Sequence, residues 1–342
     1  MTDKREILLA SLDKQFFFDK GRKKRIVSSL CGLQAQFANN PGHALRIRAD
    51  DFASGTWHDG LVKTWTFRNT LHAVRKDELG LFLSAQGVPD KWDGGWGLPP
   101  KTMARWSAFL LDKIGEGVCD REALKIASRK AGMTDDEMEC AFHGWGGLIK
   151  EMAKRGLIAY VSGTAKRFVA CGDVALMDWE EASAILLERY FRYLGPATMA
   201  DCANFFGCRG RTLLELLKKR PLPLKSIVCE GVEYWYLGKW NATREIPPCL
   251  FLAGFDQLLM AYKDRSRLVD GKHKSDVVTN TGIVHPTVLV DGSLKAKWRK
   301  DGRTLVITPF AKLTRRQRRL IDDFGGELFG GDVLQVVFND EE

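Results

Sequence analysis

The chain has 342 residues, of which 45% are hydrophobic and 28% charged, a composition typical of folded soluble proteins. One hydrophobic core rarely serves so long a chain, so we expect two or three domains. No apolar run approaches the roughly 18 residues that span a bilayer, and the first residues lack the apolar stretch of a signal peptide. We therefore expect a cytoplasmic protein without a membrane segment.

The eight cysteines are scattered and form no CxxC pair. Zinc ribbons and dithiol redox sites use closely spaced cysteines, so neither is indicated. Cys140 and His143 have metal-ligand spacing, but no second pair accompanies them, and we expect them to pack in a core. We predict no metal and no cofactor.

The net charge of +9 is concentrated in clusters. Ten Lys or Arg residues and a single acid lie between Lys295 and Arg319, and smaller basic clusters cover Lys20–Arg25 and Arg209–Lys225. Such clusters can be ordinary solvated surface. Three of them favour a polyanion as partner, because each neutralised phosphate releases counterions and raises affinity.

Residues 1–98 predict helices over 4–17 and 22–32, then a variable stretch, then two strands, "LVKTWTF" and "TLHAVR". Residues 99–176 repeat this order of helices and a hairpin. Asp120 and Thr134 are suitable helix N-caps, and "GLIAYVS" and "KRFVACG" read as strands around a turn at Gly163.

Residues 177–245 show the order most clearly. A helix over 178–193 is stopped by Gly195-Pro196, Thr198 caps a second helix over Met199–Phe206, and a third covers Arg211–Lys219. Two strands then meet at a tight turn, Glu230-Gly231. Helices followed by a hairpin are typical of a winged helix-turn-helix, so we predict three unequal copies in series.

Residues 246–342 differ, because three β-runs turn at Asp291-Gly292 and Asp301-Gly302 before a basic helix over Leu313–Phe324 and a last strand, "DVLQVVF". We predict a small β-rich, barrel-like domain, or a sheet with one helix packed on it. The predicted fold class is thus α+β, with three winged-helix units followed by this C-terminal domain.

Five short motifs occur in an order that resembles a known family: "GLQAQ" (32–36), "RNTLH" (68–72), "YLGPATMAD" (193–201), "FDQLLMAYKDR" (255–265) and "HPTVLVDGSLKAKWR" (285–299). The chain is similar to the bacterial tandem winged-helix DNA glycosylases of the azinomycin-resistance, interstrand-crosslink type. The resemblance implies that Gln34 and Gln36, which flank Ala35, are the catalytic residues. A related branch has Asp at the second position.

Glutamine is not a useful base near neutral pH, but its amide is a strong oriented dipole. An N7-alkylated guanine already carries positive charge and leaves without a proton donor, so two amides need only place a water and stabilise an oxocarbenium-like state. Side chains at i and i+2 share a face only on an extended backbone. We therefore expect the helix to end near Gly32 or Leu33. Alternatively, Gln34 and Gln36 only cap that helix.

We expect a set of basic and aromatic residues to contact DNA: Arg46, Arg48, Arg68, His72, Arg209, Arg211, Lys297, Trp298 and Arg299. His72 could equally pack beside Trp65, and Trp298 could be a core residue or a wedge. Asp256 and Arg265 resemble a structural polar pair that ties domains together.

The predicted activity is a monofunctional DNA glycosylase that releases cationic N7-alkylated purines, including crosslinked ones, from double-stranded DNA and acts as a monomer. One alternative is a non-enzymatic winged-helix regulator or damage binder, although regulators usually pair symmetric half-sites through a dimer. A lyase-type glycosylase is a third possibility. It requires an amine nucleophile, and no lysine adjoins the glutamines.

Overall fold

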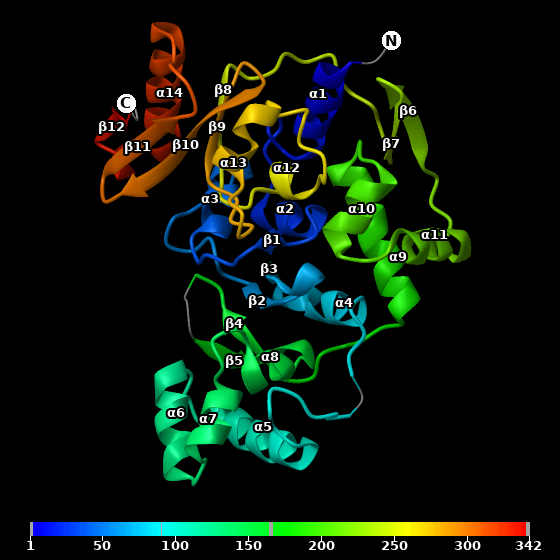
Figure 1. Ribbon diagram of the computed structural model, residues 1–342, viewed down its shortest axis with the longest axis vertical. Coiled ribbons are helices and arrows are strands. Elements are labelled where there is room, and N and C mark those ends of the chain that lie inside the picture. Colours follow the sequence, from blue (N-terminus) through cyan, green and yellow to red (C-terminus); the bar gives the residue numbers. More distant parts are fainter. Residues whose placement is uncertain (1–2, 90, 164–166, 340–342) are drawn as a thin grey trace. The chain divides into compact units, whose positions relative to one another are not determined.

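The computed structural model describes residues 3–89, 91–163 and 167–339 (Figure 1). The chain forms two compact units. Unit 1 comprises residues 1–34, 39–57 and 187–342, and unit 2 comprises residues 35–38 and 58–186. Helices and strands are both abundant, so the predicted mixture of α and β structure is confirmed.

Unit 1 begins with three helices and one short strand: α1 (Lys4–Lys14), α2 (Lys23–Ser29), β1 (Leu33–Gln34) and α3 (Asn40–Arg48). Both predicted helices are present but end earlier than expected. Helix α2 stops because Cys31 and Gly32 adopt positive φ angles of 55° and 81°, which turn the backbone out of the helix. The Asn-Asn-Pro-Gly run at residues 39–42 opens α3, since proline is well suited to a first helical turn.

The next part of unit 1 follows the predicted order closely. Its elements are the end of α9 (Trp179–Arg189), a π-helical turn (Tyr190–Leu194), α10 (Met199–Phe206), α11 (Gly210–Lys219), β6 (Lys225–Cys229) and β7 (Val232–Tyr236). Thr198 caps α10 as predicted and forms a capping box with Asp201. Glu230 and Gly231 both have positive φ, as a two-residue type I′ hairpin turn requires.

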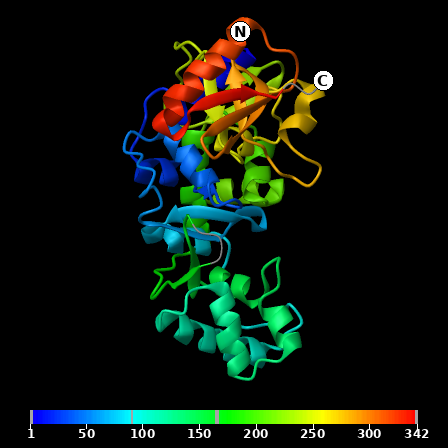
Figure 2. The same ribbon diagram turned by 90° about the vertical axis from the view of Figure 1, so that its left-hand side faces the viewer.

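The C-terminal part of unit 1 is an open five-stranded sheet in the order β12-β11-β10-β9-β8. Its elements are β8 (Cys249–Leu252), α12 (Gln257–Met260), α13 (Lys274–Val277), β9 (Thr287–Val290), β10 (Ser293–Asp301), β11 (Thr304–Pro309), α14 (Arg315–Phe329) and β12 (Gln335–Phe338). Helix α14 lies against this sheet (Figures 1 and 2), and its Ile321 and Phe329 share a core with Val288 and Trp298. The predicted strands and helix are confirmed. Among the described residues β8 and β12 are free edges, so the sheet does not close into a barrel.

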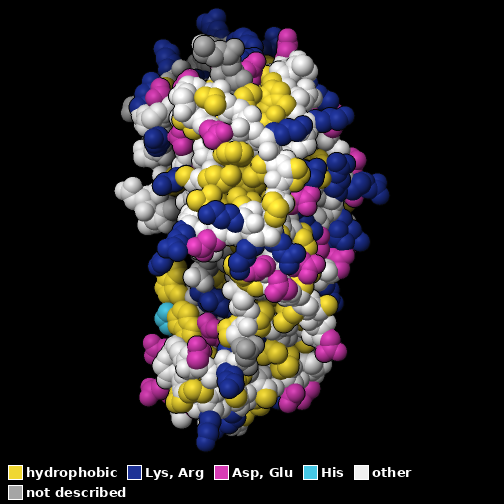
Figure 3. Space-filling view, turned by 90° about the vertical axis from the view of Figure 1, so that its right-hand side faces the viewer, with side chains coloured by type: hydrophobic (Ala, Val, Ile, Leu, Met, Phe, Trp, Pro, Cys, Tyr) yellow, Lys and Arg dark blue, Asp and Glu magenta, His cyan; other side chains and the backbone are white. Residues whose placement is uncertain are grey.

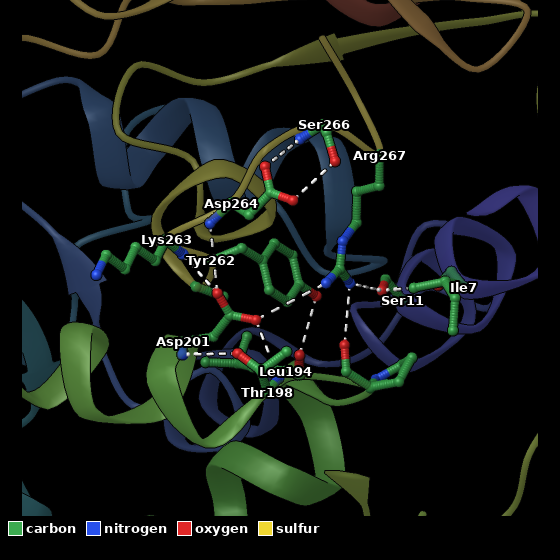
Figure 4. A network of polar contacts seen from close by, with 12 residues as sticks. Ile7, Ser11, Leu194, Thr198, Asp201, Tyr262, Lys263, Asp264, Ser266 and Arg267 are labelled. Carbon is green, nitrogen blue, oxygen red and sulfur yellow. Dashed lines mark hydrogen bonds and ion pairs between the residues drawn. The ribbon is translucent and has the colours of Figure 1, made fainter. Parts of the chain in front are cut away.

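A buried polar network ties α10 to the segment that follows α12 (Figure 4). The Asp201 carboxylate accepts hydrogen bonds from the backbone N–H groups of Thr198 (2.9 Å) and Lys263 (2.7 Å). The Arg267 guanidinium lies 3.9 Å from that carboxylate and 3.8 Å from the centre of the Tyr262 ring, and it donates to the Pro196 carbonyl (2.9 Å). Because these groups satisfy one another, unit 1 holds charges in its interior without leaving them unpaired.

Within the described residues, unit 2 contains two hairpins, the first part of α9 and five further α-helices: β2 (Leu61–Trp65), β3 (Leu71–Arg75), α4 (Leu79–Ser84), α5 (Pro100–Gly115), α6 (Arg121–Lys130), α7 (Asp135–Ala141), α8 (Gly147–Lys154), β4 (Ile158–Val161) and β5 (Phe168–Ala170). Both hairpins and the N-caps Asp120 and Thr134 were predicted and are confirmed. The two hairpins are joined by pairing of β2 with β4, where Lys63 is opposite Tyr160.

That pairing is outside what local patterns predict, because it joins residues about a hundred positions apart. Trp65 from the first hairpin packs in the same core as Trp106 and Leu148. The two compact units follow different limits from the predicted segments 1–98, 99–176, 177–245 and 246–342, and those limits stay a prediction. No helix within the described ranges is both long and apolar enough to cross a membrane.

Candidate active site

The glutamine segment, residues 33–38, lies between the end of α2 and the start of α3. The backbone leaves helical geometry at Cys31, becomes extended at Leu33 and Gln34, and does not return to helix before Asn40. This is the exit that the i and i+2 spacing of the glutamines requires. The limit between the two compact units also falls here, after Gln34.

The two glutamines differ in exposure. Gln34 is only 4% exposed and Ala35 is buried beside it, whereas Gln36 is exposed. The backbone N–H of Ala35 donates to the carbonyl of Leu71 on β3 (2.8 Å), which fixes the segment between the two side chains. The segment therefore offers one amide held in the protein and one amide available to solvent.

The start of the segment is fixed by a residue that the sequence patterns did not single out. Gln257, the first residue of α12, is 1% exposed, and its Nε2 donates to the carbonyls of Leu30 (3.1 Å) and Gly32. These carbonyls belong to the end of α2, which would otherwise lack partners. The only hint in the sequence is that Gln257 lies within the motif "FDQLLMAYKDR".

Asp256, beside Gln257, is paired differently from the prediction. Its carboxylate accepts from both terminal nitrogens of Arg48 (2.9 and 2.6 Å) and from the Leu258 N–H (2.9 Å). Arg265 instead donates from Nε to the Leu259 carbonyl (2.9 Å). The expected Asp256–Arg265 pair is therefore wrong, although Asp256 does have the structural role that was predicted.

Arg48 is wrongly predicted as a DNA contact. Its side chain is 0% exposed, lies 4.1 Å from the centre of the Phe17 ring, and donates from Nε to the Gln15 carbonyl (3.0 Å). Nε and both terminal nitrogens of Arg48 donate to partners inside unit 1. Burial of an arginine is favourable only with such partners, and a phosphate would have to displace them.

His72 and Trp298 are also interior residues, so their predicted contacts with DNA are corrected. His72 on β3 is fully buried, and its Nδ1 is 2.6 Å from the Thr66 hydroxyl. Burial, with the nearby charge of Arg68, lowers the pKa of His72 from 6.5 to about 3, so the ring is neutral at physiological pH. Trp298 is buried under α14 and donates from Nε1 to the Leu252 carbonyl (2.9 Å). Of the two roles left open for it, the core role is the one observed.

The other predicted DNA contacts remain accessible to different degrees. Arg46 has a mostly buried side chain that pairs with Asp332 and covers the Phe329 ring. Arg68 is partly exposed in the turn between β2 and β3, where it adopts a left-handed conformation with φ of 54°.

Two pairs of basic residues are clearly on the surface. Arg209 and Arg211, at the start of α11, are exposed, and Arg211 pairs with Glu215 (2.8 Å). On β10, Lys297 and Arg299 alternate with the buried Ala296 and Trp298, so they lie on the face of the strand away from the core. Figure 3 shows Lys and Arg mixed with Asp and Glu over the face drawn, so positive charge there is not continuous.

The part of the chain that the structure describes contains no evident set of metal ligands. Within those residues, no three His, Cys, Asp or Glu side chains are grouped where they could hold an ion. The cysteines are free thiols, and Cys140 is partly buried.

Comparison with known proteins identifies the family of the chain. The family model described as "DNA glycosylase AlkZ-like" matches residues 27–329. The curated "Interstrand DNA cross-link repair glycosylase" of Streptomyces sahachiroi is 24% identical over 342 residues, covering 91% of each chain. The solved structure of the Streptomyces sahachiroi DNA glycosylase AlkZ superposes with a TM-score of 0.79, at 22% identity, over 99% of this chain and 100% of that one. The match over residues 27–329 shows that the chain belongs to the AlkZ-like DNA glycosylase family, which confirms an enzyme of DNA repair over a non-enzymatic regulator.

Proposed function

We propose that this glycosylase hydrolyses the N-glycosidic bond of cationic N7-alkylated purines in double-stranded DNA, including purines joined in interstrand crosslinks. The observation that carries the proposal is the glutamine segment itself. Gln34 and Gln36 lie on a non-helical backbone fixed on both sides of Gln34, by Gln257 and by the Ala35 N–H bond to Leu71. Neutral dipoles in such a segment suit a leaving group that is already positively charged.

The proposed reaction needs no residue to donate a proton to the base. The bond between C1′ of the sugar and N9 of the cationic purine breaks, and its electron pair neutralises the departing base. The amide oxygens of Gln34 and Gln36 hold a water that adds its oxygen to C1′ and stabilise the developing oxocarbenium charge. The proton lost by that water passes to solvent, so the products are an abasic sugar and a neutral alkylpurine.

We further propose that three segments are winged helix-turn-helix units that bind the duplex, within a monomer that acts in the cytoplasm. In the third segment Ala197 bridges to Trp235 of β7, and in the second Asp120 bridges to Arg167 beside β5. Such a short strand before the second helix, paired with the wing, supports a winged helix in each case. The proposed phosphate contacts are the exposed residues Arg209, Arg211 and Arg299 and the partly exposed residues Arg68 and Lys297.

The test is base release from duplex DNA that carries N7-methylguanine, measured by mass spectrometry under single-turnover conditions. Gln34→Met keeps the buried volume but removes the amide dipole, and Gln36→Ala does so at an exposed position. Each variant should slow release about 10- to 1000-fold, by analogy with the loss of one preorganised polar group. DNA affinity and melting temperature should change little.

Gln335→Ala is the matched control, because this exposed glutamine on β12 bonds only to Thr304 in the described structure. It should leave the rate unchanged. If both variants release the base at the normal rate but melt at lower temperature, the glutamines only cap the end of α2. If the wild-type protein releases no alkylated purine, the proposed substrate is wrong.

A further inference from the structure

The end of the loop between β8 and α12, together with the first residue of α12, contacts the turn before the glutamine segment and the helix after it. This stretch consists of Gly254, Phe255, Asp256 and Gln257, here termed the 254–257 brace. Phe255 adopts a left-handed conformation with φ of 54°, which is unfavourable for a bulky side chain. Such strain persists only where the surroundings fix the backbone, and here it precedes two buried polar side chains.

The brace fixes the upstream end through Gln257. Both contacts of Nε2, to the carbonyls of Leu30 and Gly32, are made to the turn that ends α2. Its Oε1 has no hydrogen-bond partner among the described residues, although the side chain is 1% exposed. An unsatisfied buried carbonyl is unfavourable by about 1–3 kcal/mol, so stability alone does not account for a glutamine here.

The same brace fixes the downstream end. A Cβ atom on Gly254 would lie 3.0 Å from Oδ1 of Asn40, the first residue of α3, so the brace backbone and α3 are in close contact. Asp256 holds Arg48, the last residue of α3, in a two-bond ion pair. Four consecutive residues thus fix the helix before the glutamine segment and the helix after it.

We infer that Gln257 is a positioning residue for base release, which acts by holding the Leu30–Gly32 turn and so setting the position of the Gln34 amide. The inference rests on the proposed catalytic role of Gln34. Two neutral dipoles can orient a water only if they are held within about 0.5 Å of the productive geometry. A displacement of 1 Å can cost about 100-fold in rate. Gln257 has no need to touch DNA, so its loss should change the rate and leave binding unchanged.

The test uses Gln257→Met, which keeps the side-chain volume and removes both donors. Single-turnover base release should fall about 10- to 100-fold, while the DNA dissociation constant stays within twofold. Amide hydrogen exchange of residues 30–36 should accelerate, because the turn has lost its side-chain contacts. Gly254→Ala disturbs the other end of the segment by contact with Asn40 and should slow release to a smaller extent.

Gln15→Met is the matched control. Gln15 is also fully buried in unit 1, donates from Nε2 to the Tyr262 hydroxyl (3.1 Å), and has an Oε1 without a partner among the described residues. Among the described residues the Gln15 side chain donates to Tyr262 and not to residues 30–40. Gln15→Met should lower stability to a similar degree but leave the rate and the exchange of residues 30–36 unchanged.

A double-mutant cycle separates positioning from general loss of structure. If Gln257 acts through Gln34, then adding Gln257→Met to the Gln34→Met variant should lower the rate of base release less than threefold. The dipole that Gln257 positions is already absent in that variant. Full additivity, or a normal rate for Gln257→Met with a slow Gln34→Met, would overturn the inference and leave the proposed function intact. A normal rate for Gln34→Met would instead reject the proposed catalytic role of Gln34, on which the inference rests.

Discussion

Replacement of Arg48 by methionine tests whether this residue supports the interior or contacts DNA. The side chain is 0% exposed and makes two bonds to Asp256 and one to the Gln15 carbonyl. Methionine fills a similar volume but leaves the Asp256 carboxylate buried without its countercharge. Breaking a buried pair in this way typically costs about 3–5 kcal/mol. Because Asp256 also accepts from the Leu258 N–H, we expect a loss near the lower end, about 3 kcal/mol in the free energy of unfolding of unit 1.

The assay is urea denaturation followed by circular dichroism, together with DNA binding measured below the transition. Arg244→Met is the control, because Arg244 also makes two bonds to an aspartate, Asp19, and lies over a phenylalanine ring. In this pair, however, Arg244 and Asp19 are both exposed. The loss of Arg244 should lower the stability much less than the loss of Arg48, because solvent screens an exposed ion pair. A stable Arg48→Met variant with weakened DNA binding would refute the interior role and restore the predicted phosphate contact.

Two further predictions concern pH and salt. Burial, and then the charges of Arg46 and Lys300, lower the pKa of His43 from 6.5 to about 4. The unfolded chain therefore binds a proton below pH 6.5 that the folded chain does not, and stability should fall between pH 6.5 and 4 by up to about 1.4 kcal/mol per pH unit from this residue. In urea titrations at several pH values, the free energy of unfolding of His43→Phe should fall less steeply with decreasing pH than that of the wild type. An identical fall in the two proteins would contradict the lowered pKa of His43. Replacement of both Lys297 and Arg299 by alanine should reduce the slope of log affinity against log salt by about 1.8, since each phosphate contact contributes about 0.9. An unchanged slope in fluorescence-anisotropy titrations would exclude both residues from the interface.

Local elements were predictable because short-range chemistry determines them. The side chain of Thr198 is followed three residues later by Asp201, and the pair forms the capping box that starts α10. Glu230-Gly231 forms the tight turn of β6 and β7 because Gly231 accepts positive φ without strain. The end of α2 near Gly32 was predicted from the spacing of Gln34 and Gln36, and the positive φ of Cys31 and Gly32 produces it.

The interior polar residues were not predictable from one sequence. Arg48 and Arg299 look alike in a basic chain, yet one is buried against Asp256 and the other is exposed on β10. A charged residue shows no periodicity that reveals a partner about two hundred positions away. The pairing of β2 with β4 was missed for the same reason, since each hairpin is complete by its own local pattern.

The buried charges of unit 1 have a chemical reason if the proposed function holds. A carboxylate or a metal-bound hydroxide can tolerate some misplacement, because a full charge acts strongly over several ångströms. An amide dipole acts over a shorter range and depends on its direction, so catalysis by glutamine requires a scaffold with little freedom. The Arg48–Asp256 pair fixes the end of α3 to the start of α12, and Gln257 extends that contact to the turn before Gln34. In the proposed mechanism, neutral amides carry out the catalysis, and buried ionic and hydrogen-bonded contacts hold them in place. Loosening of the scaffold should therefore lower the rate of base release before it unfolds the protein.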